Sequence, residues 1–180
     1  VLAAGLRKMY AVEVICHPSD LTDAASRLEL FQRVRGLGRK FQMLINVAGL
    51  DYEGIFSERD RQEVLSIVRL NIEATLDVTH TMLAHMQPGG PFHIINVASL
   101  AAFYPMPVKA TYAASKRFLL DFSLALRNEI QEQGGTVTAL CPAGLPTTAS
   151  CIEGIEAQGL MGQLTTVNIG KVASQTVDAA

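Results

Sequence analysis

The sequence predicts an α/β fold, a doubly wound parallel sheet in three α/β/α layers. Apolar runs of strand length alternate along the chain with longer segments of helical period, which is typical of repeated βα units. The 180 residues, 49% of them hydrophobic, are enough to bury one core, so residues 1–180 are expected to form a single domain. Polar or glycine-containing turns follow the predicted strands, where open parallel sheets bind their ligands.

The first half of the chain is expected to alternate helices and strands. In order, these elements are a helix already under way at Val1–Tyr10, a strand at Val12–Cys16, a helix over 22–37, a strand at Phe41–Asn46 and a helix from Ser57 to about Met86. Gly36 and Gly38 end the second helix. Ser57, with Asp60 three residues on, is the expected N-cap of the third.

The second half repeats the pattern with clearer stop signals. Its expected elements are a strand at Phe92–Val97, a helix over 109–133, a fourth strand at Thr136–Leu140 and a helix from about Thr166 to the end. Pro88-Gly89-Gly90 precedes the first of these strands, and Gly134-Gly135 stops the helix that follows it. Residues 148–165 are expected to be irregular.

The composition excludes several classes of function. A net charge of −2 provides no electrostatic footprint for nucleic acid or an anionic membrane. No apolar run approaches the roughly 20 residues that span a bilayer, and the N-terminus lacks the pattern of a secretory signal. Three cysteines without metal-ligand spacing indicate reduced thiols in a cytoplasmic protein. The four histidines are scattered, so no metal site is expected.

Ser99, Tyr112 and Lys116 form the most informative pattern in the chain. A phenol and an ammonium four residues apart on a helix share one face, and the positive charge lowers the pKa of the tyrosine from about 10. A serine hydroxyl from a strand end would give a reacting oxygen its second hydrogen bond, so the set could move a proton on or off an alcohol or carbonyl. The Tyr-x-x-x-Lys spacing alone is weak evidence for such a site, because about 0.1 such pairs are expected by chance in a chain of this composition.

The context of the other turns strengthens this interpretation. Asp20, Asn46–Gly49, Ser99 and Pro142–Gly144 each follow a predicted strand, and Tyr112 and Lys116 open the helix after one of them. The carboxyl ends of parallel strands meet at one edge, so these features are expected to converge there. With these motifs the chain resembles the short-chain dehydrogenase/reductase family along nearly all of its length. The matching motifs are Asp20-Leu-Thr-Asp23, Asn46-Val-Ala-Gly49, Asn96-Val-Ala-Ser99, Tyr112-Ala-Ala-Ser-Lys116 and Cys141-Pro-Ala-Gly-Leu-Pro-Thr147.

The resemblance implies a Rossmann-like fold and an NAD(P)-dependent oxidoreductase that interconverts a secondary alcohol and a ketone. It implies that Tyr112 is the acid/base, that Lys116 lowers its pKa and holds the nicotinamide ribose, and that Ser99 orients the substrate oxygen. Asn71, midway along a long helix, would anchor a water that links Lys116 to solvent. The residues that the resemblance assigns to cofactor binding are Asp20, Leu21, Asn46, Ala48, Gly49, Tyr112, Lys116, Pro142, Ala143, Gly144, Leu145 and Thr147. The motifs do not distinguish NAD from NADP.

The chain departs from the family pattern in three places. Val47 replaces an asparagine. This replacement is expected to make the turn less ordered without affecting the catalytic chemistry. Ala143 replaces a glycine, and Gly144 is expected to supply the backbone freedom one residue later. No Gly-rich phosphate turn precedes Asp20, so the chain is expected to be truncated, missing its first βαβ portion and its last strand.

Several alternatives remain open at this point. Ser99 could be an ordinary turn residue, Asn71 a surface position and Asp20 a helix cap. The loop 103–107 could be packing, or an apolar wall that favours a hydrophobic alcohol or ketone. The main alternative function is a non-catalytic fragment or scaffold that associates through its long helices, and an epimerase acting on a sugar nucleotide is a third. The family resemblance also implies a homodimer or homotetramer.

Overall fold

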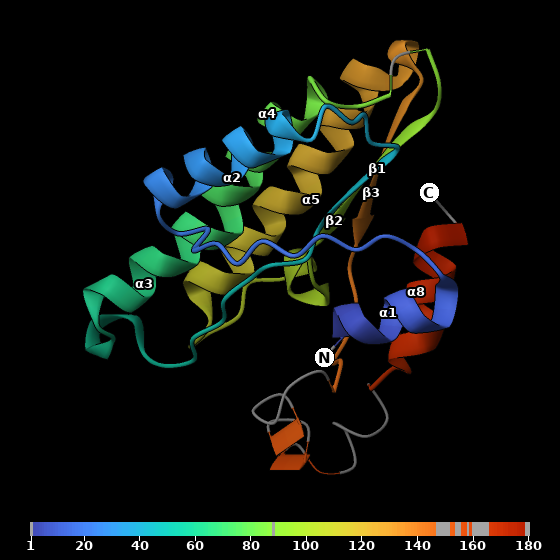
Figure 1. Ribbon diagram of the computed structural model, residues 1–180. Helices are drawn as coiled ribbons and strands as arrows, with labels where there is room; N and C mark the ends of the chain where they lie inside the picture. Colours follow the sequence, from blue (N-terminus) through green and yellow to red (C-terminus); the bar gives the residue numbers. More distant parts are fainter. Residues whose placement is uncertain are drawn as a thin grey trace.

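The computed structural model describes residues 2–87, 89–146, 152, 153, 156, 157, 159 and 166–178 (Figure 1). Its main elements are α1 (Leu2–Tyr10), α2 (Ala24–Gly36), β1 (Met43–Asn46), α3 (Arg61–Val68), α4 (Thr75–Leu83), β2 (Phe92–Val97), α5 (Ala110–Ile130), β3 (Gly135–Leu140) and α8 (Ile169–Asp178). Short helical turns join them: η1 (Phe56–Glu58), η2 (Arg69–Ala74), η3 (Leu100–Phe103) and η4 (Gln131–Gln133). Within these residues no helix is both long and apolar enough to cross a membrane.

The three strands form a parallel sheet in the order β1-β2-β3, which confirms the predicted parallel arrangement. Asn46 is paired with Asn96, and Asn96 with Ala139, so all three strands end at the same level. In Figure 1, α2, α3, α4 and α5 lie to one side of the strands, and α1 and α8 lie to the other. The turns that follow the strands therefore share one edge of the sheet.

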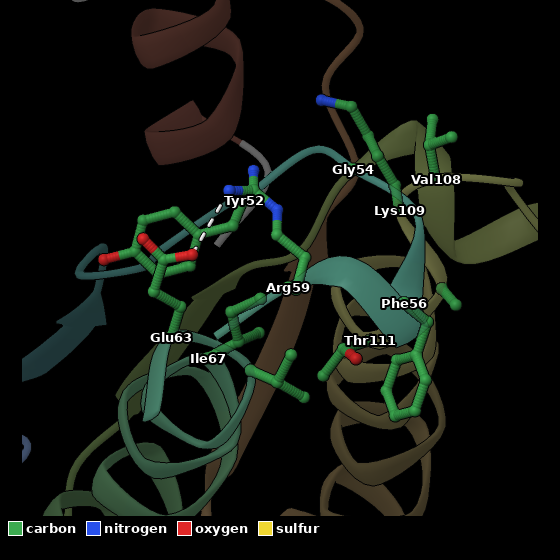
Figure 2. Close-up of a pocket in the computed structure, with 11 residues that line it drawn as sticks. Tyr52, Gly54, Phe56, Arg59, Glu63, Ile67, Val108, Lys109 and Thr111 are labelled. Atoms are coloured by element: carbon green, nitrogen blue, oxygen red, sulfur yellow. Dashed lines mark hydrogen bonds and ion pairs between the residues drawn. The ribbon is translucent and has the colours of Figure 1, made fainter. Parts of the chain in front are cut away.

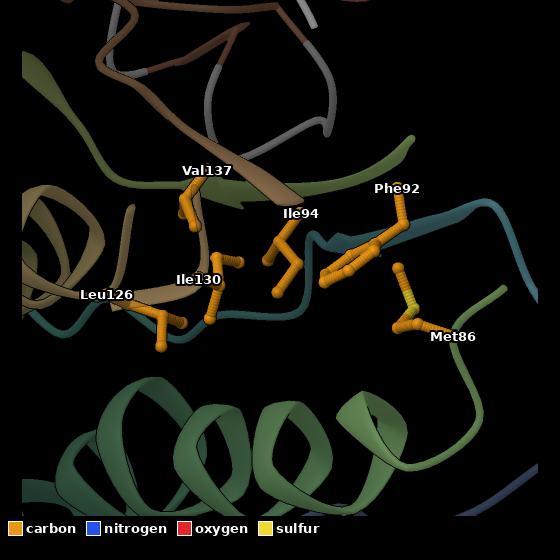
Figure 3. Close-up of a cluster of buried hydrophobic side chains, with 6 residues drawn as sticks. All are labelled: Met86, Phe92, Ile94, Leu126, Ile130 and Val137. Atoms are coloured by element: carbon orange, nitrogen blue, oxygen red, sulfur yellow. The ribbon is translucent and has the colours of Figure 1, made fainter. Parts of the chain in front are cut away.

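The hydrophobic core lies between this sheet and the helices on the α5 side. Figure 3 shows its buried cluster of six side chains, Met86, Phe92, Ile94, Leu126, Ile130 and Val137. The residues of β2 are buried on both faces of the strand, as expected for the central strand of a parallel sheet. Because β2 and α5 carry most of this core, the residues at their ends are held on the most rigid part of the chain.

The predicted strand at Val12–Cys16 is wrong. Residues 11–20 form neither helix nor strand, and Val12 and Ile15 are about half exposed. An apolar run becomes a strand only when its backbone groups pair with a neighbouring strand. This segment has no such neighbour among the described residues, so the sheet they form has three strands rather than four.

The long helix predicted from Ser57 is interrupted, and its N-cap is wrong. Ser57 lies in the short turn η1, and the chain is extended again at Arg59. Asp60 is the N-cap of α3, since its carboxylate accepts hydrogen bonds from the amides of Gln62 (2.8 Å) and Glu63 (3.2 Å). The π-helical turn η2 then separates α3 from α4, which ends at Leu83 instead of reaching Met86.

The remaining elements agree with the sequence to within a few residues. Asp23 caps α2, and the left-handed Gly134 (φ 80°) ends the turn after α5. The strand predicted at Phe41–Asn46 begins at Met43, because Phe41 forms only an isolated bridge with Met86.

A buried arginine joins α2 to the helices beside it. Arg27 is 3% exposed and donates to Glu73 in η2 (2.5 Å), to Asp77 in α4 (2.6 Å) and to the carbonyl of Leu21 (2.8 Å). Both carboxylates are about half exposed, so water can solvate them but not the guanidinium. The arginine therefore depends on its partners more than they depend on it.

This asymmetry predicts unequal effects on stability. Replacing the two carboxylates together, Glu73→Gln with Asp77→Asn, leaves a buried cation without countercharge and is expected to lower the free energy of unfolding by about 2–3 kcal/mol. Arg27→Met leaves two carboxylates that water can reach and is expected to cost only about 1 kcal/mol. Urea unfolding measures both values. Asp121→Asn, which breaks the exposed pair Arg117–Asp121, is the control, with an expected effect of under about 0.5 kcal/mol. Equal losses in the two sets of variants would contradict the asymmetry.

Candidate active site

The turns after β2 and β3 are hydrogen-bonded to each other at the carboxyl edge of the sheet. The amide of Ala98, after β2, donates to Leu140 at the end of β3 (2.8 Å), and the amide of Leu100 donates to Pro142 (2.9 Å). These bonds place Ser99 beside the turn that begins at Cys141. Two of the turns that the sequence predicts as parts of a ligand site are thus directly connected.

Tyr112 and Lys116 lie at the start of α5 and face this edge. The Lys116 ammonium lies 5.6 Å from the centre of the Tyr112 ring and donates to the carbonyl of Val97 at the end of β2 (2.8 Å). Lys116 is 4% exposed and Tyr112 is half-buried. The helical spacing therefore brings the phenol and the ammonium together, as expected from sequence.

Burial decides the protonation of Lys116. Loss of solvation lowers the pKa of its ammonium from 10.5 to about 8, while the charges of Asp51 and Cys141 act in the opposite direction. Asp51 lies in the turn after β1 and Cys141 in the turn after β3, so two of the strand-end turns affect the charge of Lys116. Near pH 8 this amine can therefore exchange a proton.

Asn71 lies in the π-helical turn η2 and is fully buried, so the alternative of a surface position is wrong. Its amide group accepts from the backbone amide of Leu50 (2.8 Å) and donates to the Leu50 carbonyl (3.0 Å) and to the Ser115 hydroxyl (3.0 Å). Ser115 in turn donates to the carbonyl of Tyr112 (2.7 Å). Asn71 thus ties the turn after β1 to the helix that carries Tyr112. Turns of π-helix are frequent at functional sites.

Gly49 brings the backbone of the first turn close to this group. A Cβ at Gly49 would lie 3.3 Å from Oδ1 of Asn71 and 3.4 Å from Nζ of Lys116. The turn, Asn71 and Lys116 therefore meet at one point. Ala48 and Gly49 are themselves exposed, so their backbone is open to a ligand.

Ser99 is half-buried, and its hydroxyl accepts from the amide of Ala101 (3.2 Å) at the start of η3. Ser99 therefore makes a hydrogen bond of the kind expected of an ordinary turn residue. Cys141 lies beside it: burial raises the pKa of the thiol, opposed by a hydrogen bond from the Ser99 backbone and by the charge of Lys116. Ser99 and Lys116 therefore both adjoin the turn after β3.

The side chain of Asn46 is bonded to α4 and to the neighbouring strand β2. Its amide donates to Thr79 (3.0 Å) and to Asn96 (2.8 Å), and Asn96 donates to Ser123 of α5 (2.9 Å). This buried chain of polar groups aligns β1, β2 and α5 just below the site. Asn46 therefore helps to fix the position of the turn, because its side-chain nitrogen is bonded to two neighbouring elements.

Asp20 and Leu21 form a compact turn before α2. The Asp20 carboxylate accepts from the hydroxyl and the amide of Thr22 (2.7 and 2.9 Å), and these bonds lower the pKa of Asp20. The helix cap is Asp23, so the alternative that Asp20 caps α2 is wrong. Arg27 holds the Leu21 carbonyl and binds Glu73, two residues from Asn71, so the turn is anchored to the helix that carries Asn71.

The turn after β3 is described as far as residue 146. Pro142, Ala143 and Leu145 are half-buried and Gly144 is exposed, while Thr147 lies outside the described residues. The expectation that Gly144 supplies the backbone freedom of the replaced glycine stays a prediction. The Gly144 carbonyl accepts from the amide of Val167 before α8 (3.2 Å), so the turn is tied to that segment.

The apolar loop between Ser99 and Tyr112 faces a different side of α5. Residues 103–107 line an open groove of about 560 Å³ with Ala113, Ala114 and Arg117, and neither Ser99 nor Tyr112 lines it. These α5 residues lie roughly 100° to 200° around the helix from Tyr112. The loop thus lines a groove apart from Ser99 and Tyr112, and a hydrophobic substrate stays a prediction.

Two charged residues beside Tyr112 were missed by the sequence reasoning. Lys109 lies 5.8 Å from the centre of the Tyr112 ring and forms an ion pair with Asp51 (2.6 Å). The spacing of three residues between Lys109 and Tyr112 was a usable signal, since such pairs share a helix face. No local pattern links Lys109 to Asp51, which is 58 residues away.

The family model described as short chain dehydrogenase matches residues 2–152. A very-long-chain 3-oxoacyl-CoA reductase from Laccaria bicolor is 32% identical over 145 residues, which are 77% of this chain and 41% of that protein. The chain spans about half the length, or less, of the curated relatives it matches.

Two solved structures share the architecture. A short-chain dehydrogenase from Sphingobium yanoikuyae in complex with NADPH matches with a TM-score of 0.71 and 28% identity, over 80% of this chain and 56% of that one. A bulky-bulky ketone specific alcohol dehydrogenase from Comamonas testosteroni matches with a TM-score of 0.75 and 24% identity, over 99% and 76%. The predicted α/β fold of Rossmann type is confirmed.

Proposed function

The chain belongs to the short-chain dehydrogenase family, and on that premise we propose that it is an NAD(P)-dependent oxidoreductase that interconverts a secondary alcohol and a ketone. One observation supports this most: a buried ammonium lies 5.6 Å from the ring of a half-buried phenol at the carboxyl edge of a parallel sheet. Burial of a lysine is costly and needs a reason beyond stability. Holding a cation next to a phenol that exchanges a proton is such a reason.

The described residues fit a nicotinamide dinucleotide at two places. At the edge of the sheet, Lys116 and the exposed backbone of Ala48 and Gly49 would hold the nicotinamide riboside, with Pro142 nearby. The turn at Asp20 would hold the adenine, since its exposed carboxylate can accept a hydrogen bond. The bound cofactor would supply or accept the hydride.

The chain's own residues would manage the proton. In the direction of reduction, Tyr112 would donate its phenolic proton to the substrate oxygen, and the Lys116 ammonium would stabilise the phenolate that is left. Ser99 would donate a hydrogen bond to the same oxygen and so orient it. In the direction of oxidation, the phenolate would remove the hydroxyl proton.

Asn71 would act by holding neighbouring parts of the site in place. Its amide already bonds Leu50 twice and Ser115 once, and these contacts fix the turn after β1 and the first turn of α5. Oδ1 can accept one further hydrogen bond, and it lies where Gly49 and Lys116 meet. That free position is compatible with the water predicted from the family resemblance, which stays a prediction.

The test is turnover with both cofactors. The protein is mixed with NADH or NADPH and a series of aliphatic and aromatic ketones, and the loss of reduced-cofactor absorbance is followed. Ser99→Ala is expected to lower kcat about a hundredfold. Ser174→Ala, on the exposed side of α8, should leave it unchanged. Tight cofactor binding without turnover in either direction would contradict the proposal and favour the non-catalytic alternative.

A further inference from the structure

Lys109 is held by two carboxylates at the edge of the Tyr112 ring. Its ammonium lies 2.6 Å from Asp51 and 3.3 Å from Glu53, both in the loop after β1, and 5.8 Å from the ring centre of Tyr112. Figure 2 shows the Lys109 side chain next to Val108, with its ammonium directed away from Thr111. Tyr112 thus has a lysine on either side in the chain, Lys109 at the N-cap of α5 three residues before it and Lys116 four residues after it.

The backbone around Lys109 is fixed at both ends of the loop. The amide of Gly54 donates to the carbonyl of Val108 (2.8 Å), and Asn71 holds Leu50 by two hydrogen bonds. Val108 has a φ of +59°, which is rare for a β-branched residue and indicates a conformation imposed by its surroundings. The ion pair of Lys109 and Asp51 is therefore part of a rigid frame rather than a loose surface contact.

The two lysines beside Tyr112 differ in the pH range over which they are charged. Burial lowers the pKa of Lys116 to about 8. Burial also acts to lower the pKa of Lys109, but the hydrogen bond and charge of Asp51, with Glu53, raise it above its ordinary value. Above about pH 8, Lys109 is thus the cation that remains beside the ring.

The other charged and titratable groups around the ring are few among the described residues. Asp51 and Glu53 come from the loop after β1, and Cys141 comes from the turn after β3. Arg59, the next cation along the first loop, pairs with Glu63 and lies over Tyr52 instead, as the dashed line of Figure 2 shows for the pair. Above about pH 8, where Lys116 has lost its charge, Lys109 and Asp51 therefore contribute to the charge balance at Tyr112.

We propose that Lys109 and Asp51 are an opposed pair of positioning residues that set the pH at which Tyr112 gives up its proton. The Lys109 ammonium favours the phenolate, and the Asp51 carboxylate opposes it. Neither is assigned a contact with the substrate, so both act through Tyr112. The catalytic meaning of this pair rests on the proposed function, but the charge effect itself can be measured without any turnover.

Opposite charges predict opposite shifts. Lys109→Met removes a cation and leaves two carboxylates, so the midpoint of Tyr112 ionisation is expected to rise by about half a unit to one unit. Asp51→Asn removes a carboxylate and is expected to lower the midpoint by a similar amount. The double variant loses one charge of each sign, so its midpoint should return close to that of the unaltered chain.

The experiment is an ultraviolet difference titration of tyrosine ionisation, done on the full chain without cofactor or substrate. The chain has four tyrosines, so each variant is also made with Tyr112→Phe, and the difference between the two curves isolates Tyr112. Lys109→Arg keeps the charge and should restore the original midpoint. Lys8→Met, on the exposed face of α1, is the control and should shift nothing. Circular dichroism shows at each pH that the variants are folded.

The outcomes separate a charge effect from a structural one. Shifts of opposite sign that cancel in the double variant support the proposal. An unchanged midpoint in Lys109→Met, or shifts of the same sign in both single variants, would overturn it. If the shifts occur as expected and the protein still turns over no ketone or alcohol, the proposed function falls while the assignment of Lys109 and Asp51 stands.

Discussion

Replacing Tyr112 by phenylalanine is expected to lower kcat for cofactor-linked turnover by about a thousandfold, because it removes one hydroxyl that donates and accepts the reacting proton. The ring itself is kept, so the packing beside Lys116 and Lys109 should be unchanged. Steady-state kinetics with reduced cofactor and a ketone measures the effect. The KM for the cofactor should change far less than kcat, since the proton is needed only in the transition state.

Tyr104→Phe is the matched control. Tyr104 lies in the loop that lines the groove on the other side of α5, so removal of its hydroxyl should leave kcat within about twofold. Thermal unfolding of both variants should be close to that of the unaltered chain. If Tyr112→Phe kept most of its turnover, the role of Tyr112 as acid and base would be refuted.

Replacing Lys116 by methionine is expected to make the protein more stable at neutral pH while it removes the activity. Lys116 loses its proton near pH 8 when folded and near 10.5 when unfolded. The shift in the pKa corresponds to about 3 kcal/mol of destabilisation below pH 8. Methionine fills a similar volume without the charge. After allowance of about 1 kcal/mol for the Val97 carbonyl that loses its donor, the net gain should be about 2 kcal/mol.

The pH dependence gives this expectation a definite sign. Between pH 8 and 10.5 the unfolded chain binds more protons at this position than the folded chain, so the free energy of unfolding of the unaltered protein rises across that window. Lys116→Met lacks this rise. The free energy of unfolding that the variant gains over the unaltered protein, measured with urea, should therefore be largest near neutral pH and disappear by about pH 10.

Lys40→Met provides the control for a lysine that also donates to a backbone carbonyl. Lys40 is exposed and donates to Ala84 (2.9 Å), so its loss should change stability by less than about 0.5 kcal/mol with no such pH dependence. A Lys116→Met variant that is less stable at neutral pH would show that the hydrogen bond to Val97 outweighs the cost of burying the charge. The stability gain with loss of activity would mark Lys116 as a residue that serves function.

The association of the chain through its long helices stays a prediction from sequence. In the structure the helix predicted over 57–86 is divided into α3, η2 and α4. α5 presents on one side an open groove that includes the exposed side chains of Phe103 and Tyr104.

Local patterns in the sequence were sufficient for much of the fold and for the centre of the site. A run of apolar residues predicts the central strand Phe92–Val97. Gly134 predicts where the helical segment that begins with α5 ends. The proximity of Tyr112 and Lys116 follows from helical geometry alone, because four residues make about one turn. For the Gly134 stop and the Tyr112–Lys116 pair the deciding interaction joins residues close in the chain, so the sequence by itself determines it.

The tertiary structure decided what depends on distant partners. The segment Val12–Cys16 has the composition of a strand but pairs with no other strand in the described chain, and pairing is what makes a strand. The burial of Asn71 depends on Leu50 and Ser115, and the charge beside Tyr112 depends on Asp51 meeting Lys109 across 58 residues. A side chain's solvation and its charged neighbours are properties of the packed chain, so these features of the site emerge only when it is folded.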